Sequence, residues 1–431
     1  MDESSKTTGS QGSKKPREII SGFLNQVICL AIPIEDIYMA QKMIAKVIDE
    51  TPLTHSHTLS RLTSYDVYLK LENLQRTGSF KLRGAYNKIA NLPEAKRRVG
   101  VMAASAGNHA QGVAFAAKHL GIPCLIVMPE GASLSKIEAT RGYGAQVVLT
   151  GETFDKAFQD AIELQKQNGM TFIHAFDDAD VIAGQGTIGI ELLEQLPDLD
   201  AVVLPVGGGG LIAGIASAIK ALKPGIKVYG VEAAGAACFR RSFDEGQRTA
   251  VSTVATIADG IAVGSPGRLT WEIAASLVDD IFVVDDEDIA RAMVILLERS
   301  KVVSEGAGAA AVASLLTHQL PTHTGKTAVV ISGGNVDVSL VSRTIEHGLV
   351  AAGRRVRFIT TLPDRPGVLA KLLQTVANAR ANVISIEHHR LAQSLVLGYV
   401  EVQLEVETRD HAHIELLCEH FRALGYEYAI H

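Results

Sequence analysis

The chain has 431 residues, of which 47% are hydrophobic and 20% charged, a composition typical of a globular protein with a large core. Its formal net charge of -6 excludes a strongly basic nucleic-acid-binding protein, so nucleic acid is not expected as a partner. No apolar run reaches the roughly 18–20 residues of a membrane span, so a membrane is not expected as a partner either. The four cysteines lie far apart without a Cys-x-x-Cys pair, which argues against a disulfide scaffold or zinc finger and indicates a reducing, cytoplasmic location.

Residues 1–30 are predicted to form a partly disordered N-terminal extension. The first 17 residues are polar and have no apolar period. A basic run then precedes the apolar stretch 19–30, which faintly resembles a signal peptide. Asn25 and Gln26 interrupt this stretch and no cleavage site follows it, so a helix packed on the rest of the chain or on a partner is the preferred interpretation.

Residues 31–350 are predicted to form one α/β domain, because short β-branched runs alternate with amphipathic stretches. The strands are expected at residues 67–71, 100–104, 124–128, 146–149, 201–205, 227–231 and 327–331. The helices are expected at residues 109–119, 133–141, 154–167, 187–195, 211–222 and 286–300. Continuous apolar strands separated by helices predict parallel sheets that are covered on both faces and bind ligands beyond the carboxyl ends of the strands.

A second, small domain is predicted at residues 355–431, after a composition shift near Gly353. Its expected strands and helices, in chain order, lie at residues 356–361, 368–379, 383–389, 397–406, 411–424 and 426–430. The resulting βαββαβ order predicts a ferredoxin-like α+β fold.

The first candidate motif, the lysine segment (residues 77–84), reads Thr-Gly-Ser-Phe-Lys-Leu-Arg-Gly. Lys81 follows an aromatic residue, in a turn before a predicted helix. A lysine partly removed from water loses its preference for the charged form, and its amine can then attack an aldehyde. Taken alone, the segment favours a surface lysine at a helix start.

The second motif, the anion loop (residues 105–109), reads Ser-Ala-Gly-Asn-His between a strand and a helix. Backbone N–H groups at a helix N-terminus suit an anion such as a carboxylate. Asn108 adds a side chain that can both donate and accept hydrogen bonds. A plain capped loop is the alternative interpretation.

The third motif, the glycine loop (residues 207–211), reads Gly-Gly-Gly-Gly-Leu, again between a strand and a helix. Four successive glycines let the backbone curl around a phosphate with several N–H donors. The loop matches neither G-x-G-x-x-G nor G-x-x-x-x-G-K-[ST], so a dinucleotide site or a nucleotide P-loop is not indicated. A flexible loop is the alternative.

The fourth motif, the serine segment (residues 332–335), reads Ser-Gly-Gly-Asn at the end of a buried strand. Ser332 can form a hydrogen bond with a ring nitrogen without carrying charge. A tight turn explains the segment equally well when it is considered alone.

Together, the four motifs resemble those of the fold-type II pyridoxal-phosphate enzymes, in the group of threonine ammonia-lyases and their serine racemase relatives. The resemblance covers roughly residues 31–343 and includes Val-Ile-Ala-Gly-Gln-Gly-Thr at residues 181–187. It implies a two-lobed α/β fold of the tryptophan synthase β type, with parallel sheets, and pyridoxal 5'-phosphate as the cofactor.

The resemblance also implies a role for each motif. Lys81 would bind the cofactor covalently and act as the catalytic base, with Phe80 packed beside the ring. Asn108 would contact the phenolic oxygen, and Ser332 would face the ring nitrogen. The cofactor phosphate would lie on Gly207, Gly208, Gly209, Gly210 and Leu211, and the substrate carboxylate on Ser105, Ala106, Gly107, Asn108 and His109.

The implied reaction is an α,β-elimination that converts L-threonine to 2-oxobutanoate and ammonia, and L-serine to pyruvate. A neutral Ser332 leaves the ring nitrogen largely unprotonated, which favours prompt loss of the β-hydroxyl over reactions that need a long-lived carbanion. Serine racemisation or β-replacement on the same fold is the alternative. An amino-acid sensor without catalysis is a further alternative, which the intact lysine segment disfavours.

Two departures from the serine racemases bear on this choice. They place a second Ser at the position of Ala106, and an alanine has no proton to exchange. They also hold a divalent cation; Glu232 is present here, but Cys238 stands where a second carboxylate is expected. A hard cation prefers oxygen ligands, so no metal is expected. Asp259 and Glu305 match family segments near the substrate and the cofactor and are further candidates.

Residues 356–430 resemble an ACT domain, the fold of small amino-acid-sensing modules, on the evidence of residues 364–369 and 381–386. The resemblance implies a homodimer or homotetramer and an amino-acid effector. Isoleucine or valine would fit feedback on isoleucine biosynthesis from threonine. A purely structural dimerisation domain is the alternative. The regulatory residues would be Asp364, Pro366, Gly367, Val368 and Asn382.

Overall fold

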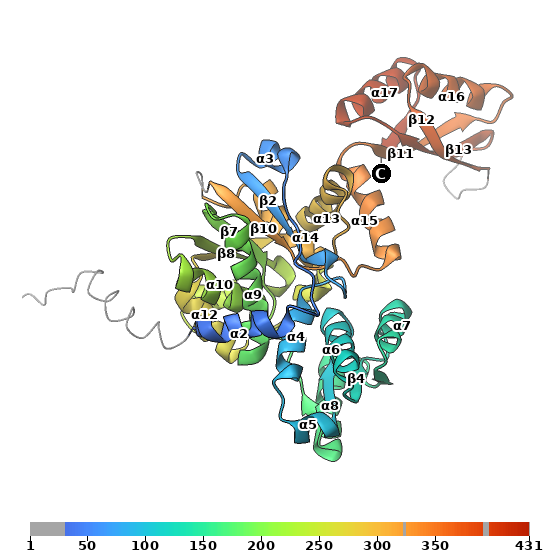
Figure 1. Cartoon of the computed structure of the whole chain (residues 1–431). Helices are drawn as coiled ribbons and strands as arrows, with labels where there is room; N and C mark the ends of the chain where they lie inside the picture. Colours follow the sequence, from blue (N-terminus) through green and yellow to red (C-terminus); the bar gives the residue numbers. More distant parts are fainter. Residues whose placement is uncertain (1–30, 322–324, 391–395, 431) are drawn as a thin grey trace, which may run out of the picture. The chain divides into compact units, whose positions relative to one another are not determined.

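The structure is a computed structural model that describes residues 31–321, 325–390 and 396–430. It consists of two compact units, which divide between Val336 and Asp337 (Figure 1). The predicted N-terminal extension, including its apolar stretch, lies outside the described residues. The compact units divide before the domain limit predicted near residue 350, since helix α15 (Val338–Ala351) belongs to the second unit. The domain limits of 31–350 and 355–431 stay a prediction.

The first unit contains a six-stranded sheet with the order β1-β2-β10-β7-β8-β9. β1 pairs with β2 in an antiparallel manner, and the other neighbours are parallel, as the continuous apolar runs predict. The strands are β1 (Leu53–His55), β2 (Asp66–Leu71), β7 (Ala201–Pro205), β8 (Lys227–Ala233), β9 (Asp280–Val284) and β10 (Lys326–Ile331).

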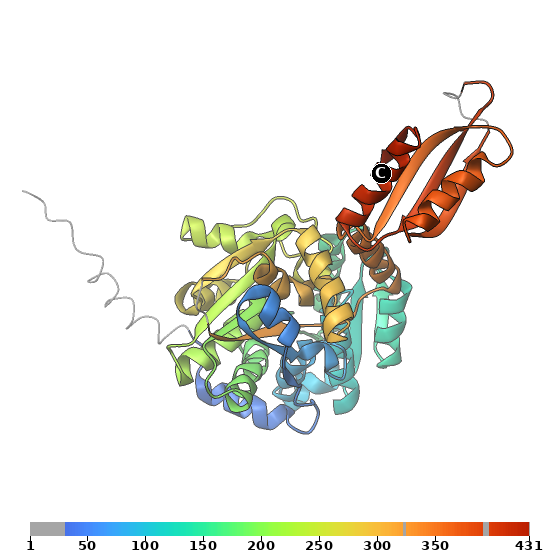
Figure 2. The ribbon, with the colours of Figure 1, turned by 90° about the horizontal axis from the view of Figure 1, so that it is seen from above.

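Helices cover both faces of this sheet, as the alternating side chains of β7 show. Ala201 and Val203 pack in a core with α13 (Asp286–Ile295) and α14 (Gly306–Leu316). Val202 and Leu204 pack in a second core with α9 (Ala179–Gln195) and α10 (Gly210–Leu222). Figure 2 shows the strands of this sheet between helices. The loops that follow the carboxyl ends of the parallel strands therefore meet at one edge of the sheet, between its two helical layers.

A smaller parallel sheet of the same unit has the order β5-β4-β3-β6. Alternate residues of β3 pack on α4 and α6 on one face and on α8 on the other. These elements are β3 (Val101–Ala104), β4 (Cys124–Met128), β5 (Gln146–Leu149), β6 (Thr171–Phe172), α4 (Lys81–Ala90), α6 (Asn108–Leu120) and α8 (Phe154–Asn168).

The remaining helices described complete the first unit. They are α2 (Ile34–Ile44), α3 (His57–Thr63), η1 (Glu72–Leu74), α5 (Glu94–Val99), α7 (Leu134–Gly142), η2 (Ala234–Ala236), α11 (Cys238–Glu245), η3 (Asp259–Ile261), α12 (Arg268–Leu277) and the π-helix η4 (Leu296–Ser300). The helix predicted at 286–300 forms over that range, as the α-helix α13 up to Ile295 and as the π-helix η4 after it.

The second unit has the predicted βαββαβ order after α15, with an antiparallel sheet in the order β12-β13-β11-β14. Both long helices lie on one face of this sheet in Figure 1. Phe358 and Phe421 form the centre of its core, with ring centroids 5.0 Å apart. The elements are β11 (Arg355–Pro363), α16 (Val368–Asn378), β12 (Asn382–His389), β13 (Tyr399–Glu407), α17 (His411–Ala423) and β14 (Tyr428–Ile430).

The two-lobed α/β unit and the ferredoxin-like unit confirm the predicted fold class. Among the helices of the described ranges, none has the length and apolar content needed to cross a lipid bilayer.

Candidate active site

Lys81 is the first residue of α4, rather than part of the turn before it. Its Nζ atom donates a hydrogen bond of 3.0 Å to the carbonyl oxygen of Ala175 and lies 5.2 Å from the centroid of the Phe80 ring. Burial lowers the pKa of Lys81 to about 8, although the negative charge of Glu305 opposes this shift. About a tenth of the amine is therefore uncharged at pH 7, and this form can act as a nucleophile or base.

The lysine and serine segments lie side by side at the ends of β2 and β10. The N–H of Phe80 donates to the carbonyl oxygen of Ser332 at 3.1 Å, and that of Gly334 donates to the carbonyl oxygen of Gly78 at 2.9 Å. Parallel neighbouring strands end at the same edge of a sheet, which explains how segments about 250 residues apart in the chain meet. The structure thus brings the predicted Lys81, Phe80 and Ser332 together.

Asn108 from the anion loop reaches the same place. Its side chain donates a hydrogen bond of 2.6 Å to Glu305 and accepts one of 2.8 Å from Asn335 of the serine segment. Removal from water raises the pKa of Glu305 to about 7, against the lowering effects of the Asn108 hydrogen bond and of Lys136. Glu305 therefore lies within the site, as its match to a family segment predicts.

The anion loop leads from β3 into α6, which begins at Asn108. Gly107 is the N-cap residue, and its N–H donates to the hydroxyl of Ser105 at 3.2 Å. The buried ring of His109 contacts the carbonyl oxygen of Ile173 through Nε2 at 2.8 Å, and burial lowers its pKa to about 3. A neutral ring bound in this way donates from Nε2, so His109 orients the loop and carries no charge. Ala106 lies partly buried in the same loop.

The glycine loop follows β7 and ends in the first turn of α10, where Leu211 is buried. Its backbone has no room for side chains. A Cβ atom on Gly208 would lie 2.3 Å from the Phe176 ring, and one on Gly209, whose φ is +91°, would lie 2.4 Å from Phe239. The glycines therefore allow the backbone to follow a narrow path at the positive end of a helix.

The loop after β6 connects the glycine loop to Lys81, and the sequence interpretation missed it. Ala175 accepts the Lys81 hydrogen bond, and Phe176 packs on Gly208 and Gly210. Asp177 anchors the loop because its carboxylate accepts hydrogen bonds from the first backbone N–H groups of α12. The only signal in the sequence is β6, and a strand of two residues is too short to predict from periodicity.

These groups fit pyridoxal phosphate. The glycine loop brings backbone N–H groups to a helix start without side chains of its own to cover them, and a phosphate is the ligand that such a helix start prefers. The Lys81 amine is suited to an aldehyde, and Ser332 and Asn108 are uncharged partners for ring heteroatoms. Among the described residues, the buried Ser79 Oγ and His109 Nδ1 atoms have no hydrogen-bond partner, which indicates a site built for a polar ligand.

Glu232, the first residue of the expected metal motif, is engaged by protein groups. Its carboxylate accepts hydrogen bonds of 2.8 and 2.7 Å from the N–H groups of Phe239 and Arg240, and lies 3.6 Å from Cys238 Sγ. Burial raises its pKa to about 7. Within the described ranges, no group of three or more His, Cys, Asp and Glu side chains could hold a metal. The absence of a metal stays a prediction.

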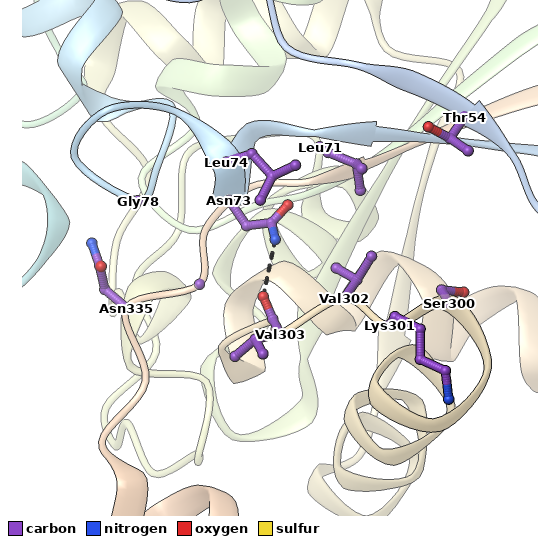
Figure 3. Close-up of a pocket in the computed structure, with 11 residues that line it drawn as sticks. Thr54, Leu71, Asn73, Leu74, Gly78, Ser300, Lys301, Val302, Val303 and Asn335 are labelled. Atoms are coloured by element: carbon purple, nitrogen blue, oxygen red, sulfur yellow. Dashed lines mark hydrogen bonds between the residues drawn. The ribbon is translucent and has the colours of Figure 1, made fainter.

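A pocket borders these motifs (Figure 3). Gly78, Gly334 and Asn335 line one part of it, and Asn73 donates a hydrogen bond of 3.0 Å across it to the carbonyl oxygen of Val303. Lys81 and the glycine loop are not among its lining residues, so this pocket adjoins the candidate active site and does not contain it. The other lining residues are Thr54, Leu71, Leu74, Ser300, Lys301 and Val302.

The predicted regulatory residues lie in the second unit, in the turn before α16 and at the starts of α16 and β12. Gly367, with a φ of +87°, is the N-cap residue of α16, which begins at Val368 two residues after Pro366. The Asp364 carboxylate accepts hydrogen bonds from Arg390, and Asn382 begins β12. Their regulatory role stays a prediction.

Comparisons with known proteins agree with this geometry. Residues 44–334 match the family model described as pyridoxal-phosphate dependent enzyme, and residues 356–415 match the ACT domain. An L-threonine ammonia-lyase of Thermotoga maritima is 50% identical over 399 residues, which cover 93% of this chain and 99% of the relative.

Solved structures are also similar to the chain, among them a threonine deaminase and a serine racemase. The processed form of threonine deaminase isoform 2 from Solanum lycopersicum has 39% identity and a TM-score of 0.67, and the match covers 77% of this chain and 94% of that one. Maize serine racemase has 36% identity and a TM-score of 0.70, and the match covers 74% of this chain and 99% of that one. The chain therefore belongs to the pyridoxal-phosphate dependent enzyme family and carries a C-terminal ACT domain.

Proposed function

We propose that the chain is an L-threonine ammonia-lyase, which converts L-threonine to 2-oxobutanoate and ammonia and also converts L-serine to pyruvate. The observation that carries the proposal is the convergence of Lys81, Asn108, the glycine loop and Ser332 at one edge of the sheets of the first unit. The identity of 50% to an L-threonine ammonia-lyase over 93% of the chain supports threonine as the substrate.

When bound, pyridoxal phosphate supplies an aldehyde that condenses with amines and a conjugated ring that accepts the electrons of a broken Cα–H bond. The backbone N–H groups of the glycine loop would hold the phosphate, and Phe80 would pack beside the ring. Lys81 would hold the aldehyde carbon, Ser332 the ring nitrogen and Asn108 the phenolic oxygen.

Lys81 moves the protons of the reaction. As the free, uncharged amine it takes the α-proton of the substrate, while the first N–H groups of α6 orient the substrate carboxylate. The resulting ammonium group is stabilised at Nζ by the carbonyl oxygen of Ala175. It passes the proton to the β-hydroxyl, which leaves as water. The remaining enamine tautomerises and is hydrolysed to the 2-oxo acid and ammonia.

Serine racemisation is the second candidate, because the fold is similar to that of maize serine racemase. Racemisation needs an acid that returns a proton to the face of the substrate opposite Lys81. Ala106, in the anion loop, has no such proton, which favours elimination. Chiral analysis of serine after incubation distinguishes the two reactions.

The second unit supports regulation by an amino acid, because it matches the ACT domain. Isoleucine or valine would fit feedback on isoleucine biosynthesis, with Asp364, Pro366, Gly367, Val368 and Asn382 as the regulatory residues. A homodimer or homotetramer is favoured by the edge strand β12, whose Ile384 and Ile386 are exposed. The cytoplasmic location is part of the same proposal.

The test uses the purified full chain with pyridoxal phosphate. L-Threonine should yield 2-oxobutanoate, and borohydride should fix the cofactor covalently on the peptide that contains Lys81. Lys81→Ala should lose both the label and turnover. A label on a different peptide, or wild-type protein that forms no 2-oxobutanoate, would contradict the proposed function.

A further inference from the structure

The side chain of Asn108 is held from two sides. Its Nδ2 atom donates to Glu305 Oε1 at 2.6 Å, and its Oδ1 atom accepts from Asn335 Nδ2 at 2.8 Å. Asn335 Nδ2 also donates to the carbonyl oxygen of Thr77 at 2.7 Å. The three side chains come from α6, the start of α14 and the serine segment, so this chain of hydrogen bonds joins distant parts of the first unit.

The hydrogen-bond partners determine which way each amide points. A backbone carbonyl oxygen can only accept, so the atom of Asn335 that faces Thr77 is the nitrogen, and both of its N–H groups are engaged. Asn108 must then present its oxygen to Asn335 and its nitrogen to Glu305. Only one of the two Asn108 N–H groups is used, which leaves the other available as a donor.

Two glycines make room for this arrangement. A Cβ atom on Gly333 would lie 2.4 Å from Glu305 Oε1 and 3.1 Å from Asn108 Nδ2. A Cβ atom on Gly78 would lie 2.3 Å from Asn335 Oδ1. Glycines in the lysine and serine segments therefore pack directly against the three side chains and hold them close together.

We infer that Glu305 and Asn335 are positioning residues that fix the Asn108 amide as a hydrogen-bond donor to the phenolic oxygen of the cofactor. The inference rests on the role proposed for Asn108. A phenolate oxygen accepts hydrogen bonds, and an Asn108 amide turned the other way would present its own oxygen to it and repel it. The two neighbours exclude that orientation.

Glu305 adds a charge whose state changes near neutral pH, because removal from water raises its pKa to about 7. The charged groups that face it are Lys81 of α4, Lys136 of α7 and Asp259 of η3, and Lys136 and Asp259 form an ion pair of 3.2 Å. A neutral carboxyl group can donate as well as accept a hydrogen bond, whereas an ionised Glu305 can only accept one and so holds the Asn108 nitrogen toward itself. The share of Asn108 amides that present a donor to the phenolic oxygen should therefore rise with pH.

The test is spectroscopic and needs no substrate. The full chain is loaded with pyridoxal phosphate, and its absorption is recorded between pH 6 and 8 together with the dissociation constant of the cofactor. Glu305→Gln keeps an acceptor for Asn108 without the charge, and Glu305→Leu removes the acceptor. Asn335→Leu removes the donor that orients Asn108. Asn73→Leu is the matched control, because Asn73 lines the same pocket as Asn335 but donates to Val303 (Figure 3).

In the wild type, the visible absorption should increase with pH, with a midpoint near the Glu305 pKa of about 7. Glu305→Gln should keep the visible band and lose this pH dependence. Glu305→Leu and Asn335→Leu should move absorption to the near ultraviolet and raise the cofactor dissociation constant about tenfold or more, the scale of a hydrogen bond to a charged group. Asn73→Leu should behave as the wild type.

Unchanged spectra and affinity in Glu305→Leu and Asn335→Leu would overturn the inference. So would a Glu305→Gln defect as large as that of Glu305→Leu, or an Asn73→Leu defect as large as that of Asn335→Leu. Because no variant is judged by turnover, these outcomes differ from a failure of the proposed function, in which the wild type binds the cofactor but forms no 2-oxobutanoate.

Discussion

At the scale of single residues, removal from water sets the charges of the candidate site. Burial lowers the pKa of Lys81 to about 8 and that of His109 to about 3, and it raises the pKa of Glu305 to about 7. Each pKa unit corresponds to about 1.4 kcal/mol of preference for one protonation state. His109 is therefore neutral at any physiological pH, whereas Lys81 and Glu305 change charge within the range in which enzymes operate.

The pKa of Lys81 predicts the pH dependence of turnover. Only the uncharged amine takes a proton, so kcat should fall about tenfold per pH unit below pH 8 and level off above it. The measurement is kcat for L-threonine between pH 6 and 9. Lys88→Gln is the control on the same helix, because Lys88 pairs with Asp178 and Asp180 and lies outside the lysine segment. A profile that is flat below pH 8 would remove Lys81 from the role of base.

At the scale of elements, a fully buried cluster of charges joins β2, η1, α4 and α9. Arg83 contacts Glu72 at 2.8 Å and Glu191 at 2.5 Å, and Glu191 contacts Lys70 at 2.6 Å. Burial alone would raise the pKa of Glu72, but the charge of Arg83 overrides this and lowers it. The cluster therefore fixes the helix that starts with Lys81 against the central sheet.

Removing one member of this cluster should destabilise the first unit strongly. Arg83→Met leaves two buried carboxylates without their main partner, at a cost of about 3–5 kcal/mol. Arg98→Met, which breaks the exposed Arg98–Glu94 pair on α5, should cost about 1 kcal/mol or less. Urea unfolding of the full chain, followed by the fluorescence of Trp271 in the first unit, measures both. Equal losses of unfolding free energy in the two variants would show that burial does not determine how much these ion pairs stabilise the first unit.

The same elements show what the sequence could and could not predict. The seven strands expected in the first domain all form, because continuous apolar runs are a direct signature of buried strands. The start of α9 was predicted at residue 187, eight residues too late, since Gly184 and Gly186 lower helix propensity. In the structure those glycines permit contact: a Cβ atom on Gly184 would lie 2.6 Å from Gly84 Cα. Close packing of this kind leaves no periodic signal.

The candidate site also has residues that could be predicted from the sequence and contacts that could not. Lys81, Asn108 and Ser332 stand in short motifs that are ambiguous alone, and their roles could be predicted only because the four motifs together resemble those of the pyridoxal-phosphate enzymes. The hydrogen bonds that fix Asn108 could not be predicted, because Glu305 lies 197 residues away from it in the chain and Asn335 lies 227 residues away. The contact of Lys81 with Ala175 depends likewise on a loop that carries no chemical group of its own.

At the scale of the whole molecule, the second unit presents an edge that favours association. β12 and β14 are the two edge strands of its sheet. On β12, Ile384 is 45% exposed and Ile386 39%, and an exposed apolar edge strand is a template for pairing with another chain. An ACT domain paired in this way would give the protein an interface far from Lys81 in sequence, where an effector could bind without competing with threonine.

Charged residues introduced on β12 should therefore prevent assembly without reducing turnover. Ile384→Lys combined with Ile386→Lys should shift the full chain to a smaller species in sedimentation analysis and abolish the response to isoleucine or valine, because like charges would face each other across the paired strands. Basal turnover of L-threonine should remain within about twofold, since both residues lie in the second unit. Ile430→Lys, which places the same charge on β14 at a residue that is 49% exposed, is the control and should leave assembly unchanged. If the double variant keeps its size and its effector response, β12 is not the pairing edge, and the assembly depends on other surfaces of the chain.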